Sequence, residues 1–353
     1  MAPSPWADGA DCPHVHPRPP STWLHYGLIP APDRRPALYA ELRATATALL
    51  DGGRAREFFF MHKPPGLRVR FQSAHAGTHA GTRAGLDGEL SEVLDGWRRD
   101  GLLREWRGGV YEPEEYLFGG PVSMAGVHRV FTADSLAWLG HHAAPAGVRA
   151  GQAWTMSLPM MRAVLDSLDI AGWEDLDVWD RLRRQTGRRL ADPGRLPAGA
   201  VTVASALRAA WSAPHRLVAA LPPHAAELVE RYREAVMAAG RRWLDSYFTV
   251  GQPAVGPREA AAFVIVFHWN RAGLSAARQA LIVEALMARP GETLAARPGL
   301  GGDEALPAGS HGDEALPAGS HGDEALPAGS HGDEALPAGS RGDEAGSGGG
   351  EAR

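Results

Sequence analysis

The spacing of apolar residues between residues 21 and 111 predicts strands and helices in a definite order. Short apolar runs and alternating segments are typical of strands, whereas apolar residues three or four positions apart indicate helices. The predicted elements are strand 23–29, a helix that Pro36 opens, strands 58–61 and 67–72, a helix over 86–97 and strand 102–111. The order β-α-β-β-α-β is that of a ferredoxin-like unit, in which both helices cover one face of the sheet.

The strand predicted at 67–72 alternates in character along its length. Val69 and Phe71 fall on one side, and Arg68, Arg70 and Gln72 fall on the other. Because the helices of such a unit occupy one face, we expect the polar row to line the opposite face as the floor of a cleft.

From residue 127 onward the pattern is helical. Apolar residues recur at helical spacing in several windows, and prolines such as Pro214 and the Pro222–Pro223 pair separate them. We therefore predict an α+β fold. A ferredoxin-like sheet region at about 21–125 is followed by a largely helical part at about 126–300, and the two parts close over a shared cleft.

The two ends of the chain differ from this body in composition. Residues 302–341 are four copies of a decapeptide, Gly-Asp-Glu-Ala-Leu-Pro-Ala-Gly-Ser-His, and the fourth copy ends in Arg341. Each copy offers one leucine against two carboxylates and two glycines, which buries too little surface to offset the entropy of ordering. We expect a disordered tail at 301–353, with a spacer or recruitment role as the alternative, and a flexible arm at 1–20.

Charge and composition exclude several classes of partner. The net charge of −5 belongs to the tail, because residues 302–353 hold 11 of the 41 acidic residues and only 2 of the 36 basic ones. The rest of the chain is mildly basic but has no basic cluster, so we expect no nucleic-acid partner. Cys12 is the only cysteine, which excludes an intrachain disulfide and a Cys-rich metal site.

No targeting or membrane segment is visible in the sequence. The N-terminal residues lack the apolar centre of a signal peptide, and the longest apolar run, 260–267, is too short to cross a bilayer. We therefore expect a cytoplasmic protein without membrane contact. Cys12, His14 and His16 have metal-capable atoms but no fourth ligand nearby, so no metal site is predicted.

Three segments carry the most distinctive residue patterns. They are the aromatic run from Phe58 into Leu67-Arg-Val-Arg-Phe71, the segment Tyr111-Glu-Pro-Glu114 through Gly119-Gly-Pro121 to Asp134-Ser135, and Phe267-His-Trp-Asn-Arg271. In this order, over residues 21–289, they resemble the C-terminal, glutamate-eliminating domain of lantibiotic dehydratases. That family has an aromatic strand running into Leu-Arg-x-Arg-Phe, a Tyr-x-Pro-Glu…Tyr-Gly-Gly-Pro segment leading to Asp-Ser, and a late His…Asn-Arg helix end.

The chain also departs from the family pattern. Gly66 stands where the family usually has a histidine, and Leu117 stands where an arginine precedes the aromatic residue of the Gly-Gly motif. In the eliminating enzymes arginines hold the glutamyl carboxylate, because a guanidinium fork fits a carboxylate. The lost arginine, and the absence of an attached glutamylation domain, make the chain similar to the stand-alone pyridine synthases of thiopeptide biosynthesis.

The resemblance implies a formal aza-[4+2] cycloaddition between two dehydroalanines of a leader-bearing, azole-containing precursor peptide. Loss of water and of the leader as its amide would complete a pyridine-centred macrocycle. This chemistry needs no metal or redox cofactor. Holding the reacting atoms together lowers its activation barrier by roughly 7–11 kcal/mol. The alternatives are a stand-alone glutamate-eliminating lyase that makes dehydroalanine and a non-catalytic leader-binding scaffold; a homodimer is an open alternative to a monomer.

Four residues are candidates for catalysis. Arg68 would polarise an amide carbonyl, and Tyr111, Glu112 or His268 would transfer protons. His268 lies in the last turn of the helix predicted before Gly273, where the macrodipole favours an imidazolium. The alternative is a packed histidine, with its neighbours merely capping the helix end. We predict that the purified wild-type chain turns over its substrate without a metal. Arg68→Ala or His268→Ala should lose activity while the variant stays folded.

Further residues are candidates for binding. An acidic leader helix would suit the arginines at positions 183–189, although such a run more often forms a solvated face. The candidates for substrate contact are Arg70, Trp154, Trp269, Asn270 and Arg271, and those for leader contact are Arg183, Arg184 and Arg188.

Overall fold

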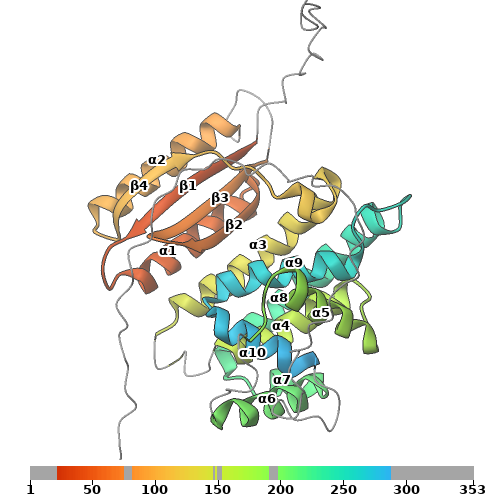
Figure 1. Ribbon diagram of the computed structural model, residues 1–353. Helices are drawn as coiled ribbons and strands as arrows, with labels where there is room; N and C mark the ends of the chain where they lie inside the picture. The colour runs from red at the N-terminus through yellow and green to blue at the C-terminus, as the bar shows by residue number, and fades with distance from the viewer. Residues whose placement is uncertain (1–21, 75–81, 146–147, 149–152, 191–197, 288–353) are drawn as a thin grey trace, which may run out of the picture. The chain divides into compact units, whose positions relative to one another are not determined.

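The computed structural model describes residues 22–74, 82–145, 148, 153–190 and 198–287 (Figure 1). These residues all belong to one compact unit, Met1–Gly301. The expectations for the arm at 1–20 and the tail at 301–353 lie outside the described residues. No helix within these ranges is long and apolar enough to cross a membrane.

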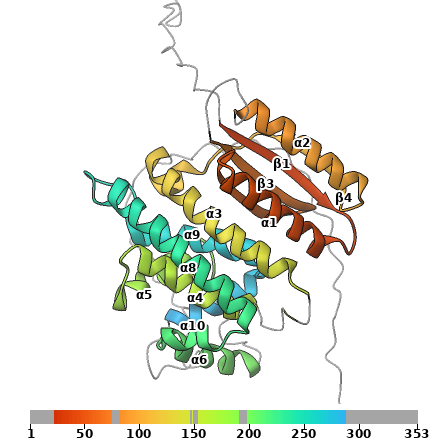
Figure 2. The ribbon, with the colours of Figure 1, turned by 180° about the vertical axis from the view of Figure 1, so that it is seen from behind.

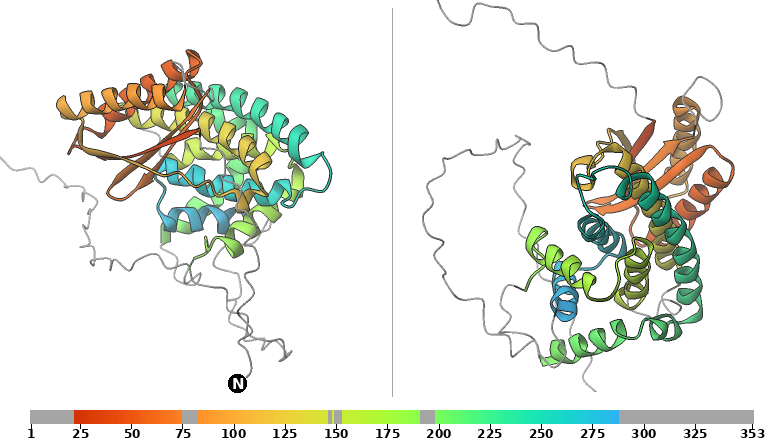
Figure 3. Two further views of the ribbon diagram at one scale, coloured as in Figure 1. Left: turned by 90° about the horizontal axis from the view of Figure 1, so that it is seen from above. Right: turned by 90° about the vertical axis from the view of Figure 1, so that its right-hand side faces the viewer.

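The N-terminal part is an antiparallel sheet with two helices on one face. The elements are β1 (Trp23–Pro30), α1 (Arg35–Asp51), β2 (Ala55–Lys63), β3 (Gly66–Ser73), α2 (Arg83–Arg99) and β4 (Leu103–Gly109). The strand order is β2-β3-β1-β4 with every pairing antiparallel, which is the ferredoxin-like arrangement that the sequence predicts. Both helices lie on the same side of the sheet (Figures 2 and 3, left).

Alternation along the strands decides which face the helices cover. Tyr26, Leu28, Val69 and Phe71 point to the helices and are all buried. The helices begin where the sequence places start signals. A proline stands in the first turn of α1, and the Thr82 side chain accepts a hydrogen bond from the Gly85 amide at the start of α2.

The C-terminal part is helical and packs against the β2 side of the sheet (Figure 1). Its helices are α3 (Pro121–Ala143), α4 (Ala153–Ser167), α5 (Asp175–Gln185), α6 (Ala198–Trp211), α7 (Pro214–Ala219), α8 (Pro223–Trp243), α9 (Pro257–Ala272) and α10 (Ala276–Met287), with the 3-10 turn η1 (Glu115–Phe118) before them. The α+β prediction is therefore confirmed.

Helix α3 holds the two parts together, because it contacts α1, β2 and α8. Its approach to the C-terminal end of α8 depends on a glycine: a Cβ at Gly126 would lie 2.4 Å from the Cγ atom of Trp243. No other residue therefore fits this position without a shift of the neighbouring helix.

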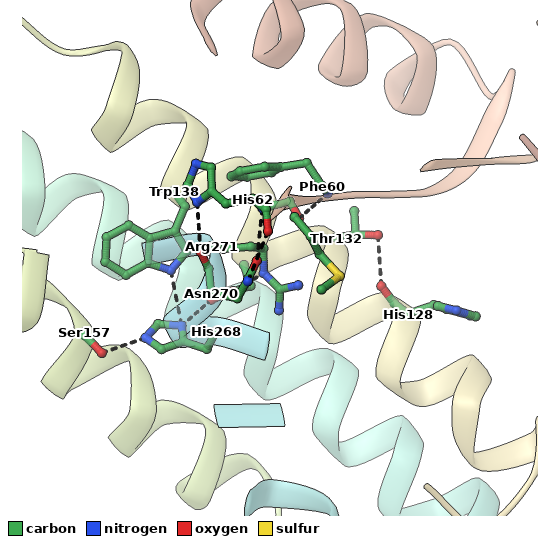
Figure 4. Close-up of polar contacts among 12 residues, drawn as sticks. Phe60, His62, His128, Thr132, Trp138, Ser157, His268, Asn270 and Arg271 are labelled. Carbon is green, nitrogen blue, oxygen red and sulfur yellow. Dashed lines mark hydrogen bonds and ion pairs between the residues drawn. The ribbon is translucent and has the colours of Figure 1, made fainter. Parts of the chain in front are cut away.

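The edge strand β2 is closed by side chains of the helical part. The backbone N–H groups of Phe58 and Phe60 donate to the hydroxyls of Thr132 (3.0 Å) and Ser135 (3.2 Å) on α3. Two residues further along, the His62 N–H donates to the Asn270 side chain on α9 at 3.0 Å (Figure 4). An edge strand carries unpaired backbone donors, so these three side chains satisfy the edge and fix α3 and α9 against the sheet.

Candidate functional site

The open face of the sheet is polar in its middle. Arg68, Arg70 and Gln72 of β3 point away from α1 and α2, as the alternation predicts. On the neighbouring strand β1, His25 pairs with Arg70, and Gly27 pairs with Arg68. The same two β1 residues pair with Gly109 and Arg107 of β4 on their other side. The face thus presents two rows, Arg70–His25–Gly109 and Arg68–Gly27–Arg107.

All residues of these rows except Arg70 line a cavity of about 300 Å³ on the open face. Gly27 and Gly109 form part of its lining and carry no side chains that would fill it. A Cβ at Gly27 would be 3.7 Å from the Arg107 Cγ atom, and one at Gly109 would be 3.7 Å from the His25 ring, which are ordinary contacts. The residues that line this open-face cavity include His25, Gly27, Lys63, Pro64, Pro65, Gly66, Arg68, Arg107, Gly109 and Val110.

The open-face cavity is cationic. Lys63, Arg68 and Arg107 line it, and no Asp or Glu is among its lining residues. Burial, with the nearby charges of Arg70 and Arg68, lowers the pKa of His25 to about 4. His25 is therefore neutral near pH 7, and the cavity suits a ligand that accepts hydrogen bonds, such as a carboxylate or an amide carbonyl.

Beside this cavity, Arg70 is buried against aromatic rings. Its guanidinium carbon lies 4.6 Å from the ring centre of Tyr111 and 4.9 Å from that of Phe59. The Tyr111 hydroxyl lies 2.8 Å from Nε2 of His128. Burial and the charge of Arg70 lower the pKa of His128 to about 3, so the ring that hydrogen-bonds with the tyrosine hydroxyl is neutral near pH 7. The predicted catalytic Tyr111 is thus 6% exposed and already hydrogen-bonded.

The other predicted catalytic residue on a motif, His268, lies in a buried network between α3, α4 and α9 (Figure 4). Its Nδ1 atom is 2.6 Å from the Asp134 carboxylate, and its Nε2 atom is 2.8 Å from the Ser157 hydroxyl. The indole nitrogen of Trp138 lies 3.2 Å from the same Nδ1 atom. Nδ1 of His268 thus lies between the Asp134 carboxylate and the Trp138 indole N–H, and Nε2 lies beside the Ser157 hydroxyl.

Arg271 completes this buried network. Its Nε atom donates to the second Asp134 oxygen at 2.5 Å, and its guanidinium carbon lies 4.3 Å from the Phe131 ring centre. Burial raises the pKa of Asp134, but the charges of His268 and Arg271 outweigh it and hold the pKa below its ordinary value. The carboxylate is therefore ionised and the ion pair persists in the protein interior.

The buried network has the donors and acceptors of a Ser-His-Asp triad but not its access. Ser157 and Arg271 are 0% exposed, and Asp134 and His268 are 1% exposed. None of these four residues lines a cavity described here. A triad needs room for a substrate carbonyl beside the serine oxygen, so the geometry favours packing over catalysis for His268 and Arg271. Their predicted roles stay untested.

The remaining predicted residues lie in several places. Glu112 is exposed in the segment before η1, and Trp154 packs against the core while Trp269 is fully buried. Asn270 binds the His62 backbone at the sheet edge. The three leader-binding candidates are occupied within the helical part: Arg183 pairs with Glu284, Arg184 with Asp180, and Arg188 with Gln279.

The structure brings together residues that sequence reasoning passed over. His25 and Arg107 face Arg68 across the sheet, and Gly27 and Gly109 complete the lining. The signal was present in principle, because β1 alternates in the same way as β3. It becomes visible only once the strand pairing is known. Within the described ranges, no group of three or more His, Cys, Asp or Glu side chains could hold a metal ion.

Comparison with known proteins identifies the class. Residues 23–289 match the family model for the C-terminal domain of lantibiotic biosynthesis dehydratases, and the chain belongs to this family. A similar solved structure is the crystal structure of the tRNA-dependent lantibiotic dehydratase MibB from Microbispora sp. 107891, with a TM-score of 0.56 and 19% identity. The alignment covers 76% of this chain and 28% of MibB.

A second similar structure is that of TsrL, with a TM-score of 0.41 and 15% identity over 74% of this chain and 93% of TsrL. No curated protein matches the sequence significantly. The chain thus spans about a quarter of the length of MibB. At 19% identity the likeness to MibB shows the fold, and the family match shows the class.

Proposed function

We propose that the chain is a peptide-maturation enzyme of the thiopeptide pyridine synthase type. Family membership supports a role in the maturation of ribosomally made peptides. The observation that carries the proposal is the cationic open-face cavity, whose lining offers Arg68 and Arg107 as donors and contains no carboxylate. Such a lining suits the carbonyl groups of a peptide substrate that carries two dehydroalanines, azoles and a leader.

In this function Arg68 polarises the carbonyl of one dehydroalanine amide. Transfer of the amide N–H proton to the carbonyl oxygen gives a hydroxy-azadiene, and the charge that develops on oxygen is stabilised by the guanidinium. The azadiene then forms two carbon–carbon bonds to the second alkene. The hydroxyl leaves as water, and the leader leaves as its carboxamide, so the sequence is redox-neutral.

The largest task in this reaction is positional. Closing the peptide loop between two distant alkenes costs a few kcal/mol, about (3/2)RT ln n plus a constant. A surface that holds both alkenes as a near-attack pair supplies roughly 7–11 kcal/mol. The open-face cavity lies on strands of a sheet whose opposite edge is fixed by α3 and α9, which gives such a surface a rigid base.

Leu117 supports cycloaddition over glutamate elimination. This leucine stands where the family pattern has an arginine, and its side chain packs against the hydrophobic core. The carboxylate of a glutamyl ester therefore finds no guanidinium at this position. The lyase remains the second candidate, because Arg68 and Arg107 are also able to bind a carboxylate.

Mass spectrometry of the purified full chain with two peptides tests the proposal. One peptide carries a leader, azoles and two dehydroalanines, and the other carries a glutamylated serine. Release of the leader amide, with a core lighter by the leader and one water, is the expected result from the first peptide. Conversion of only the glutamylated peptide would instead establish the lyase. A peptide that co-purifies with the protein at unchanged mass would establish a scaffold.

Removal of the Arg68 guanidinium is the matching mutational test. Arg68→Ala should lower kcat by roughly 10²–10³-fold, the typical loss of one oxyanion donor, and the melting temperature should not change because Arg68 is exposed. Arg104→Ala is the control, since Arg104 is an exposed arginine of β4 that does not line the open-face cavity. Equal activity in both variants would remove Arg68 from the mechanism.

A further inference from the structure

A second cavity lies at the junction of the sheet and the helical part. It has a volume of about 520 Å³ and is bounded by α1, the end of β2, the end of α3 and the end of α9. Its lining contains ionisable side chains of tyrosine, histidine, lysine and arginine, and none of its lining residues is Asp or Glu. The residues that define this junction cavity include Arg35, Tyr39, His62, Lys63, His142, Ala272 and Gly273.

Two of these side chains form a hydrogen-bonded pair with a fixed proton arrangement. The Nδ1 atom of His62 lies 2.8 Å from the backbone carbonyl oxygen of Asn270, so Nδ1 carries the ring proton and donates it. The Nε2 atom of His62 lies 2.9 Å from the Tyr39 hydroxyl. In the neutral ring Nε2 is therefore the acceptor, and the tyrosine O–H donates to it.

A second histidine and several cations face this pair. The Nε2 atom of His142 lies 2.7 Å from the backbone carbonyl oxygen of Arg271, and the His142 ring is 5.0 Å from that of Tyr39. Burial lowers the pKa of His62, the Asn270 carbonyl opposes this shift, and the charges of Arg35 and Arg271 add to it. His62 is thus neutral near pH 7 and has a lone pair that is able to take the tyrosine proton.

We propose that Tyr39 and His62 form a proton relay for a substrate group bound in the junction cavity. In this relay Tyr39, which lines the junction cavity, is the catalytic residue whose hydroxyl contacts the substrate, and His62 is the positioning residue that receives the tyrosine proton. In the forward step a substrate N–H proton moves to the Tyr39 oxygen while the Tyr39 proton moves to Nε2 of His62. The imidazolium keeps its Nδ1–H bond to the Asn270 carbonyl, and the reverse transfer returns a proton to a departing group.

The relay rests on the proposed function for the identity of its substrate. In that function one peptide amide must lose a proton, and a leaving group must gain one. The two cavities share the β2–β3 turn, Lys63 to Leu67, as a common wall. A peptide that crosses this turn places one part at Arg68 and another at Tyr39. The cations Arg35 and Lys63 then favour the anionic forms that proton removal produces.

The test compares two variants that keep the hydrogen-bonded frame. Tyr39→Phe removes only the hydroxyl. His62→Asn places an amide N–H near the Nδ1 position, so the donor to the Asn270 carbonyl is kept while the acceptor for Tyr39 is lost. Tyr232→Phe is the matched control for the tyrosine, because the Tyr232 hydroxyl is buried with no partner among the described residues. His224→Asn, at a partly buried histidine of α8, is the control for the histidine.

The variants are assayed as full chains with the bis-dehydroalanine peptide and with the glutamylated peptide. Tyr39→Phe and His62→Asn should each lower kcat by roughly 10²–10⁴-fold, the usual contribution of a positioned acid–base group, with KM and the melting temperature unchanged. In the wild type, kcat should fall at acidic pH where His62 becomes protonated, and His62→Asn should lack this limb.

The outcomes separate the relay from the proposed function. A kcat within threefold of the wild type in both variants, or an effect on KM alone, overturns the relay while pyridine formation stands. Conversion of only the glutamylated peptide overturns the pyridine synthase, and the same variants then test the relay in the elimination, which also needs a base. A wild type that converts neither peptide overturns both proposals. Tyr39→Phe keeps the test decisive if His62→Asn does not fold.

Discussion

The buried network and the junction cavity contain the same kind of chemistry in different surroundings. Asp134, His268 and Ser157 are joined by hydrogen bonds of 2.6 and 2.8 Å, and Tyr39 and His62 are joined by one of 2.9 Å. The first set is at most 1% exposed, whereas the second lines a cavity of about 520 Å³. Short hydrogen bonds between a histidine and its neighbours therefore do not separate a reactive group from a structural one. In the proposed relay, access to a cavity is what distinguishes the reactive pair from the buried one.

The cost of burial explains why the Asp134 carboxylate is held by two partners, although the two terminal guanidinium nitrogens of Arg271 are buried without a hydrogen-bond partner among the described residues. An ion pair taken out of water loses several kcal/mol of hydration for each ion and regains it only with good geometry and further hydrogen bonds. Asp134 meets this condition through Arg271 and His268. The network thus specifies how α3, α4 and α9 pack, and it should respond to mutation as a stability element rather than as a reactive one.

Asp134→Ala should have the largest effect on stability. It leaves the Arg271 charge without its partner in the interior, and breaking one side of a buried pair costs about 3–5 kcal/mol. The free energy of unfolding from urea titration measures the loss. Asp180→Ala is the control, because Asp180 pairs with the exposed Arg184 one helical turn away. The loss there should be about 0.2–1 kcal/mol.

Similar losses in the two aspartate variants would show that the buried network contributes little to stability. That result would favour a functional role for His268 and Arg271 over a structural one. A large loss of stability in Asp134→Ala alone would show that the buried network is structural. The motif residues of α3 and α9 would then be assigned to folding.

The second prediction concerns His128 and the dependence of stability on pH. Its pKa in the folded chain is about 3, because of burial and the charge of Arg70, against an ordinary value of 6.5. The unfolded chain therefore takes up a proton below pH 6.5 that the folded chain excludes until about pH 3. Stability from this group is complete above pH 6.5 and falls as the pH decreases, by about 2 kcal/mol between pH 7 and pH 5.

His128→Gln removes this titration and keeps an acceptor for the Tyr111 hydroxyl. Urea titrations at pH 7 and pH 5 should show a loss of stability that is about 2 kcal/mol smaller in the variant than in the wild type. An identical loss in both proteins would mean that His128 is protonated in the folded state. A protonated His128 needs contact with solvent, so Arg70 and Tyr111 beside it would then be part of the solvent-accessible open-face cavity rather than of the core.

The fold was more accessible to sequence reasoning than the site was. Alternation at Val69 and Phe71 against Arg68 and Arg70 is a local signal, and it assigned both the strand and its faces. The two helix patterns around it then gave the ferredoxin-like order. Local periodicity is sufficient for such elements because each face of a strand or helix must bury its own apolar residues.

The sites depend on contacts between residues far apart in the chain. His25 meets Arg70 and Gly109 only through strand pairing, and Tyr39 meets His62 only when α1 packs beside β2. Motif residues drew attention instead, but Thr132, Ser135 and Asn270 close the edge of the sheet. A polar motif alone does not reveal whether its partner is a substrate or a backbone amide.

The smallest expected effect concerns Asn270, which joins the two regions. Its side-chain oxygen accepts from the His62 N–H, and its amide donates to the His62 carbonyl at 3.0 and 3.2 Å. Asn270→Ala removes both hydrogen bonds at a partly buried edge and should lower the free energy of unfolding by about 1–2 kcal/mol. Hydrogen exchange of the His62 amide should accelerate, while exchange in the centre of β3 should stay slow.

Gln72→Ala is the control for this last variant, because it removes a side-chain hydrogen bond to Thr22 from the same sheet without touching the β2 edge. Its effect on the His62 amide should be negligible. If Asn270→Ala leaves both stability and His62 exchange unchanged, α9 is held against β2 by apolar packing and by the hydrogen bond from His62 Nδ1 to the Asn270 backbone carbonyl. The Asn270 side chain would then be available for the substrate contact that the sequence predicts. Asn270 would in that case count as part of the reactive region rather than of the structural one.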